Sequence, residues 1–152
     1  MKNISIRFAS AEDVAVVHRL LTALEDVLDA SSGVRRTQED LLRFGFSDSA
    51  FFKVLIAWRG TEAVGLALFF PEFSTWKGAP GVYLQDLYVV ADMRGTGLGR
   101  QLMKAVYTHA REWGARYCKL AVHGNNDKAI AFYQQLGFRI SENERVLILD
   151  DM

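Results

Sequence analysis

Cysteine is almost absent from this chain of 152 residues, in which Cys118 stands alone. No disulfide can form within the chain, so its stability has to come from an apolar core. Three histidines are also present, and they are scattered at His18, His109 and His123 without the short spacings typical of metal ligands. The sequence therefore predicts neither a disulfide-stabilised fold nor a metal site.

An excess of one charge and a long apolar run are missing as well. Lysine and arginine together number 18, and aspartate and glutamate together also number 18. This balance offers no strongly basic surface to nucleic acid. No signal peptide and no apolar run long enough to span a bilayer are visible. We therefore expect a cytoplasmic protein that binds neither nucleic acid nor membrane.

A single domain over residues 1–152 is predicted, because this length suits one core and no linker, repeat or low-complexity segment divides it. Apolar periodicity predicts the order β-α-α-β-β-β-α-β-α-β-β, a mixed sheet with helices on its faces. A loop is expected at 71–81, and a parallel crossover within 82–123. The strands are expected at 4–10, 51–58, 63–70, 82–90, 117–123, 138–140 and 145–149, and the helices after Ser10 and at 37–44, 98–113 and 126–136.

The stretch LYVVADMRGTGLGRQLMKAVYTHA (87–110) has glycine at positions 95, 97 and 99, where an apolar strand gives way to a helix. Each glycine disfavours a helix by about 1 kcal/mol relative to alanine. Amide N–H groups at a helix N-terminus are unpaired and partly positive, and glycines leave them open to an anion. The pattern favours a phosphate or pyrophosphate cradle, with Arg94 and Arg100 as charge partners, over a tight turn that merely uses glycine.

The motifs that are missing narrow the kind of phosphate ligand. The nucleotide-triphosphate loop G-x-x-x-x-G-K-[ST] does not occur, and the spacing G-x-G-x-G differs from the dinucleotide fingerprint G-x-G-x-x-G. Arg94, Gly97 and Gly99 do fit the pattern R-x-x-G-x-G. So short a pattern is weak alone, and its place between a strand and a long amphipathic helix strengthens it.

Together with the segment NNDKAIAFYQQLGF (125–138), this loop resembles the GNAT superfamily of N-acetyltransferases. In that superfamily an asparagine opens the second helix, a Phe-Tyr pair follows, and Leu-Gly-Phe ends it. Here these are Asn126, Phe132–Tyr133 and Leu136–Gly137–Phe138. The resemblance implies an α/β fold of the α+β type, with a mixed, mostly antiparallel seven-stranded sheet flanked by about four helices. It also implies a homodimer.

Within the superfamily, the chain is similar to the diamine (spermidine/spermine) N-acetyltransferase branch, including the segment FFPEFSTWKGAPGVYLQDLYVVADMRG. That branch has a glutamate just before the aspartate of its Y-L-x-D-x-x-V motif, thought to help deprotonate the amine. This chain has Gln85 there, followed by Asp86, and glutamine cannot take a proton at neutral pH. Since neighbours on a strand alternate, Gln85 and Asp86 are expected on opposite faces.

The resemblance implies direct transfer of an acetyl group from acetyl-CoA to a primary amine of a small molecule, such as a polyamine, a diamine or a lysine-like amine. Tyr133 would protonate the leaving thiolate, and Asn126 would touch CoA. The Val89 N–H would face the thioester carbonyl. The main chain of Leu87, Tyr88 and Val89 would hold the pantetheine arm, and the loop Arg94, Gly95, Thr96, Gly97, Leu98, Gly99 and Arg100 would bind the pyrophosphate.

The base and the acceptor site are left open at this level. Asp86, Glu72, Glu25 and Asp26 are candidate bases, with Gln85 beside Asp86 in the catalytic and substrate region. Glu25 and Asp26, which lie in the acidic end of the first helix, are also expected to bind a cationic substrate, and Trp76 to cover it. Tyr133 as a packing residue, Asn126 as a helix cap and a merely solvated acidic face at Glu25 and Asp26 are the alternatives. The rival functions are acetylation of an aminoglycoside or a protein N-terminus, and a non-catalytic acyl-CoA sensor.

Overall fold

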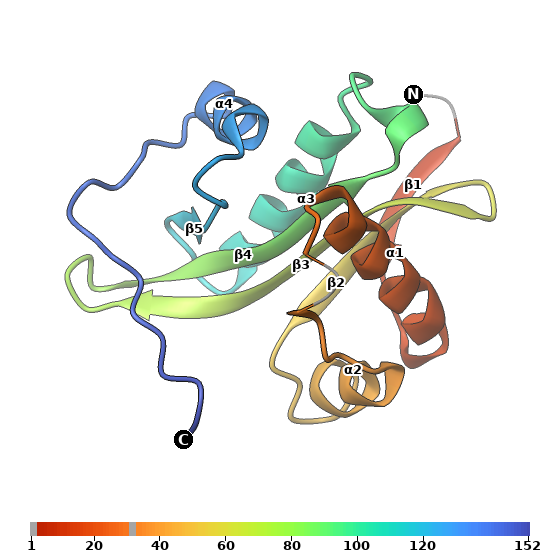
Figure 1. Cartoon of the computed structure of the whole chain (residues 1–152), viewed down its shortest axis with the longest axis horizontal. Coiled ribbons are helices and arrows are strands. Elements are labelled where there is room, and N and C mark those ends of the chain that lie inside the picture. The colour runs from red at the N-terminus through yellow and green to blue at the C-terminus, as the bar shows by residue number, and fades with distance from the viewer. Residues whose placement is uncertain (1–2, 31–32) are drawn as a thin grey trace. The chain divides into compact units, whose positions relative to one another are not determined.

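The computed structural model describes residues 3–30 and 33–152, and the chain divides into two compact units, Met1–Leu120 and Ala121–Met152. The second unit holds α4 (Asp127–Gln135). The first unit holds the sheet and the other helices (Figure 1). Its elements are β1 (Ile4–Phe8), η1 (Ala11–Asp13), α1 (Val14–Val27), α2 (Gln38–Gly45), β2 (Lys53–Arg59), β3 (Glu62–Ser74), β4 (Ala79–Val89), η3 (Ala91–Met93), α3 (Leu98–Glu112) and β5 (Cys118–Leu120).

The sheet has the order β1-β2-β3-β4-β5. The first four strands pair antiparallel, and β4 pairs parallel with β5 at Val82–Cys118, Tyr83–Lys119 and Leu84–Leu120. Because α3 connects these two parallel strands, the predicted crossover is confirmed. The predicted α+β class, with four α-helices and a mixed, mostly antiparallel sheet, is confirmed as well.

The sheet has five strands among the described residues, whereas seven were expected. The segments 138–140 and 145–149 form no strand. Val146 and Leu147 are 81% and 89% exposed. An apolar run supplies side chains for a strand, but a strand also needs a neighbour whose main-chain groups pair with its own, and composition cannot supply that partner.

The prediction of a loop over 71–81 is wrong, because β3 and β4 continue as a hairpin through both prolines and turn only at 75–78. Pro71 lies opposite Val82 in the register. The Val82 N–H donates to the Tyr117 carbonyl at 2.9 Å, so it faces away from β3. By alternation, Pro71 and Pro80 both stand at positions that form no hydrogen bond between β3 and β4. A proline lacks the N–H for such a bond, and here none is needed.

Side-chain caps mark where two of the helical segments begin. Ser10 and Asp13 form a capping box before η1 and α1, and Thr37 forms another with Asp40 at α2. In the second box the Asp40 N–H donates to Thr37 Oγ1 at 3.1 Å. Helix α3 ends just before Gly114, whose φ of 89° is the left-handed conformation that stops a helix.

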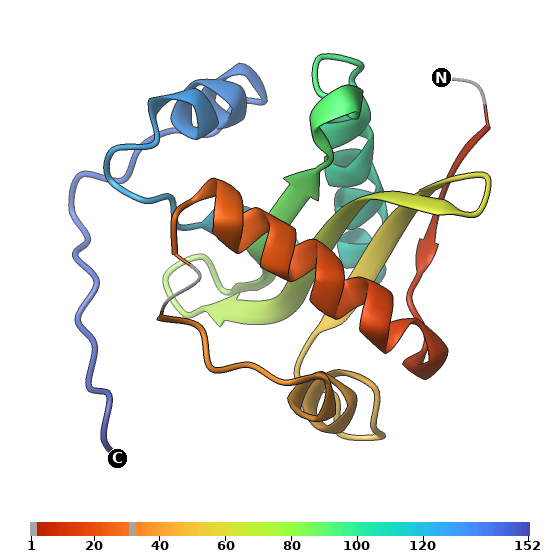
Figure 2. The same ribbon diagram turned by 45° about the vertical axis from the view of Figure 1, so that its right-hand side comes forward.

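Helices cover both faces of the sheet: α1 and α2 lie on one face and α3 on the other (Figure 2). Alternate residues of β2 divide between these layers, because Val54 and Ile56 pack with α1 and α2 whereas their neighbours point the other way. The face of α3 that packs on the sheet is fully buried and consists of Leu98, Leu102, Met103, Val106 and Ala110. This arrangement leaves the N-terminal end of α3 beside the end of β4.

Candidate active site

A pocket of about 400 Å³ lies on the face of the sheet that carries α1 and α2. Gln85 and Asp86 line it from β4, and the other residues come from α1, α2, β3 and the segments that lead into α2 and β2. The structure thus places two of the residues predicted from sequence at one site. The lining residues are Leu21, Arg36, Leu41, Phe51, Phe52, Leu68, Phe70, Gln85 and Asp86.

A β-bulge in β4 explains why Gln85 and Asp86 share this pocket, against the prediction that they face opposite ways. Leu84 pairs with Phe69, but Asp86 pairs with Leu68, so Gln85 is an extra residue without a partner in β3. An extra residue disrupts the alternation locally and bends the strand. Both side chains can therefore line one pocket.

The same bulge decides which main-chain groups of β4 are free. The Val82 N–H points away from β3, but the Val90 N–H donates to the Val64 carbonyl of β3 at 3.0 Å. Without the extra residue, the N–H groups of Val82 and Val90 would point to the same side of the strand, because the two residues are an even number of positions apart. Past the bulge, the main-chain N–H and carbonyl of Tyr88 therefore point toward β3. The main-chain groups of Leu87 and Val89 point away from β3.

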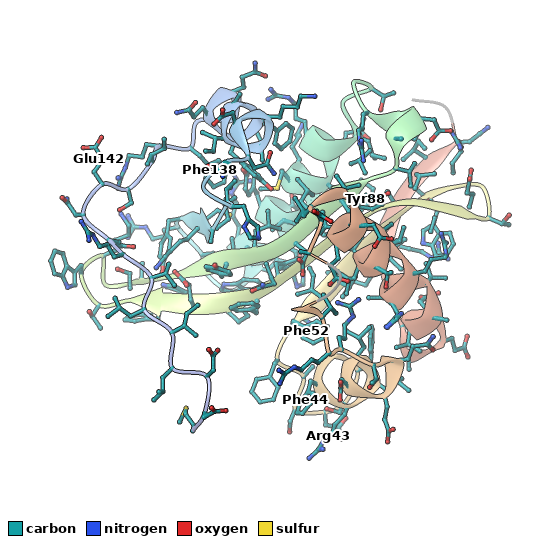
Figure 3. The ribbon with its side chains drawn as sticks, viewed as in Figure 1. Arg43, Phe44, Phe52, Tyr88, Phe138 and Glu142 are labelled. Carbon is teal, nitrogen blue, oxygen red and sulfur yellow. The ribbon has the colours of Figure 1, made fainter. Side chains whose placement is uncertain are left out.

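The edge of β4 beyond the bulge has no strand beside it in the described part of the first unit, since β5 pairs only with Val82–Leu84. The Val89 carbonyl accepts a hydrogen bond from Arg94 Nε at 3.2 Å. The Val89 N–H is the donor that the family resemblance would place against a thioester carbonyl. It faces this open edge, one residue beyond Tyr88, whose side chain packs with the α1 and α2 layer (Figure 3).

The glycine loop connects β4 to α3 and leaves helix amides exposed. Gly95 and Gly97 have φ of 77° and 89°, a left-handed conformation that disfavours any side chain. A Cβ at either position would meet nothing within 4 Å, so conformation rather than crowding requires glycine. Gly97 caps α3 and its carbonyl accepts from Gln101. The N–H groups of the first turn lie before this bond and have no acceptor within the helix.

The other loop residues have distinct environments. The Thr96 hydroxyl donates to the Met93 carbonyl at 2.6 Å, which holds the turn. Leu98 is 1% exposed as a whole residue, so it belongs to the core and offers a ligand almost no surface, unlike its neighbours in the loop. Arg94 and Arg100 are exposed. The loop thus combines open amides with cationic side chains.

Asp86 is the perturbed acid of the pocket. Its pKa is raised from 3.8 to about 6, mainly by burial and next by the carboxylate of Glu25, while the guanidinium of Arg36 opposes the shift. Burial disfavours the charged carboxylate because the pocket walls solvate it poorly. A carboxylate with this pKa is mostly ionised at pH 7 and is a stronger base than an ordinary aspartate.

Glu25 and Arg36 form a bidentate ion pair beside the pocket. Arg36 Nη1 lies 2.5 Å from Glu25 Oε2, and Arg36 Nη2 lies 2.9 Å from Glu25 Oε1. Each side chain is 18% exposed. A fork-to-carboxylate pair of this kind uses both carboxylate oxygens. Both carboxylate oxygens of Glu25 are therefore already bound by Arg36, which argues against Glu25 as the general base.

The other acidic and aromatic candidates lie outside the residues that line the pocket. Glu72 accepts a hydrogen bond from the Tyr117 hydroxyl at 2.9 Å. Asp26 is exposed on α1. Trp76 is 99% exposed at the tip of the β3–β4 hairpin. Of the four candidate bases, Asp86 is the one that lines the pocket.

Several lining residues have no signal in the sequence. Phe52 comes just before β2 (Figure 3). Its ring packs against Gly45 at the end of α2. A Cβ on Gly45 would come within 2.3 Å of that ring, so Phe52 can occupy this place only because residue 45 is glycine. Phe51, Phe52, Phe70 and Arg36 belong to no motif, and only the packing of α1 and α2 on the sheet brings them together.

The second unit contains Asn126 and Tyr133. Asn126 caps α4, because its Oδ1 accepts a hydrogen bond from the Ala129 N–H at 3.1 Å. The Tyr133 ring packs edge-on against Phe132 at 5.1 Å and Phe138 at 5.4 Å between centroids. The capping role expected as an alternative for Asn126 is thus present. Its contact with CoA and the proton transfer by Tyr133 stay predictions.

Two negative findings concern residues 3–30 and 33–152. Within these ranges, no group of three or more histidine, cysteine, aspartate or glutamate side chains is placed to hold a metal ion. No helix in them combines the length and apolarity needed to cross a membrane.

Known proteins are similar to this chain in sequence and in fold. The sequence model of the acetyltransferase (GNAT) family matches residues 20–138. The chain is 33% identical over 147 residues to thialysine N-epsilon-acetyltransferase of Sus scrofa, covering 91% of this chain and 86% of that protein. It is 36% identical over 114 residues to spermidine/spermine N(1)-acetyltransferase-like protein 1 of Homo sapiens, covering 68% of this chain and 16% of that protein.

A solved structure has the same fold at lower identity. An aminoglycoside acetyltransferase from an uncultured soil metagenomic sample, in complex with sisomicin, superposes with a TM-score of 0.79 at 19% identity. The match covers 99% of this chain and 97% of that one. At this identity the likeness supports the fold alone.

Proposed function

The chain belongs to the acetyltransferase (GNAT) family and is an N-acetyltransferase, and from this premise we propose that it transfers an acetyl group from acetyl-CoA to a primary amine of a small molecule. Polyamines, diamines and lysine-like amines are the acceptor classes, and the relative that acts on thialysine supports the last of them. The observation that carries the proposal is Asp86, a carboxylate with raised pKa in an apolar pocket next to the open edge of β4.

The residues of the first unit fit acetyl-CoA. The exposed amides at the start of α3 and the guanidinium groups of Arg94 and Arg100 suit a pyrophosphate. The free main-chain groups of Leu87 and Val89 suit the amides of a pantetheine arm. When bound, acetyl-CoA supplies an acetyl thioester, whose carbonyl the Val89 N–H would stabilise as negative charge develops on oxygen.

Asp86 is assigned the role of general base. An amine attacks only when it is neutral, and an alkyl ammonium of pKa about 10.4 costs about 4–5 kcal/mol to deprotonate at pH 7. Proton transfer to a carboxylate is less uphill by about 3 kcal/mol when the pKa of that carboxylate is about 6 instead of 3.8. The apolar walls assist, because they also disfavour the charged ammonium. Gln85 can accept or donate a hydrogen bond beside it but cannot take the proton.

Tyr133 is assigned the role of proton donor to the leaving thiolate, on the family motif that contains it. A phenol of pKa about 10 donates to a thiolate whose acid has a pKa of about 8.5 only when it is well positioned. A homodimer and a cytoplasmic location belong to the proposal as well. Equilibrium sedimentation of the purified protein and fractionation of cells would test them.

The test of the proposed function is amine-dependent release of thiol from acetyl-CoA. The panel contains lysine, thialysine, putrescine, spermidine, kanamycin and a short peptide, with a control that lacks amine. We expect turnover with at least one small-molecule amine and its acetylated product by mass spectrometry. Asp86→Asn should lower that turnover at least tenfold, whereas the matched variant Asp26→Asn should not, because Asp26 is exposed and outside the pocket. Binding of acetyl-CoA without turnover on any amine would instead support a sensor.

A further inference from the structure

The residues that line the pocket determine which chemical groups of the acceptor can bind next to its reacting amine. Apart from Arg36, Gln85 and Asp86, the lining residues are apolar, and three of them are phenylalanines. A volume of about 400 Å³ lies within the range of small-molecule sites, so the pocket can hold part of the acceptor's body in addition to its amine.

The charges available to the acceptor are few. Among the described residues that line the pocket, Asp86 is the one carboxylate, and the reacting amine uses it. Glu25, the nearby acid that acts on Asp86, has both oxygens bound by Arg36. Within the described lining, no carboxylate is left for a second ammonium group, and the charged side chain that remains, Arg36, is positive.

We propose, on the basis of the proposed function, that this pocket selects an amine carried on an uncharged apolar body and excludes a second cationic amine from its interior. An ammonium group that loses its water without gaining a carboxylate is strongly disfavoured. The attraction of a cation to a phenylalanine face is too small to replace that partner. The pocket therefore favours acceptors in which a long apolar spacer separates the reacting amine from the next charge. It disfavours polyamines whose amine groups are closely spaced.

A matched set of acceptors tests this selection. Hexylamine and 1,6-diaminohexane have the same carbon chain and differ only in the second amine. We expect kcat/KM for hexylamine to be at least tenfold higher. We expect 1,12-diaminododecane to recover most of this loss, because its second ammonium can reach solvent. An equal or higher kcat/KM for 1,6-diaminohexane would overturn the proposal, and so would turnover of other amines but not hexylamine. In both cases the proposed function stands. The proposed function fails only if no small-molecule amine reacts.

A variant at the mouth of the pocket gives a second, independent test. Phe51 lines the pocket and is 69% exposed, so Phe51→Glu places a carboxylate at the rim without disturbing the core. This variant should shift the ratio of kcat/KM values at least tenfold toward 1,6-diaminohexane. Phe73→Glu is the matched control, because Phe73 is 63% exposed and does not line the pocket. An unchanged ratio in Phe51→Glu, or the same shift in both variants, contradicts the assigned selection.

Discussion

Replacing Asp86 by asparagine should make the protein more stable while it loses activity. The side chain keeps its shape but loses a charge that the pocket solvates poorly. Its folded pKa of about 6 lies above the ordinary 3.8, so the ionised carboxylate destabilises the folded state. A pKa difference of one corresponds to about 1.4 kcal/mol, which gives about 3 kcal/mol for this rise.

The sign and the pH range follow from the two pKa values. The destabilisation is fully present above pH 6 and disappears as the pH falls toward 3.8, where Asp86 becomes protonated in both states. Asp86→Asn should therefore gain about 3 kcal/mol in free energy of unfolding at pH 8, or about 6–12 °C in Tm, and almost nothing at pH 4. Urea unfolding of both proteins at several pH values measures the difference. A gain independent of pH, or a loss at pH 8, would refute the argument from burial.

The remaining predictions concern the glycine loop, α4 and the pocket wall. Gly97→Ala and Gly78→Ala should each cost about 1–2 kcal/mol of strain, because both residues have positive φ. Only Gly97→Ala should weaken the binding of acetyl-CoA measured by calorimetry. Equal affinities in the two variants would show that the glycine loop does not bind acetyl-CoA. Tyr133→Phe should lower kcat with unchanged acetyl-CoA affinity, whereas a loss of both would mark Tyr133 as structural. Gly45→Ala should displace the Phe52 ring and raise KM for the amine alone, and an unchanged KM would argue against that wall.

Local features of the fold could be predicted from the sequence because each depends on a few neighbouring residues. Ser10 and Thr37 cap helical segments by contacts three residues away, and the glycines at 95, 97 and 99 mark the change from β4 to α3. The hairpin over 71–81 could not be predicted in this way. Two prolines ordinarily indicate a loop, and only the register of β3 on β4 shows that both fall where no hydrogen bond is required.

The candidate site was only partly predictable for the same reason. The glycine loop is one continuous motif, so its residues can be recognised in the sequence. The pocket joins Leu21, Arg36, Phe52 and Asp86 from separate elements, and no spacing connects them. The bulge at Gln85 depends on pairing with β3, so alternation alone misplaced that residue. The raised pKa of Asp86 depends on burial, which exists only in the folded chain.

The pH dependence of kcat/KM for the best amine, in the native protein and in Asp86→Asn, tests the central claim most directly. This parameter reports the ionisation of free enzyme and free substrate. Because ionised Asp86 takes the proton of the bound ammonium, log kcat/KM of the native protein should be level from about pH 6 to 9 and fall with a slope of one below about pH 6, where Asp86 becomes protonated. Asp86→Asn needs an amine that is already neutral, so its log kcat/KM should rise with a slope of one throughout. A slope of one from about pH 6 to 9 in the native protein, or a level range retained in Asp86→Asn, would contradict Asp86 as the base.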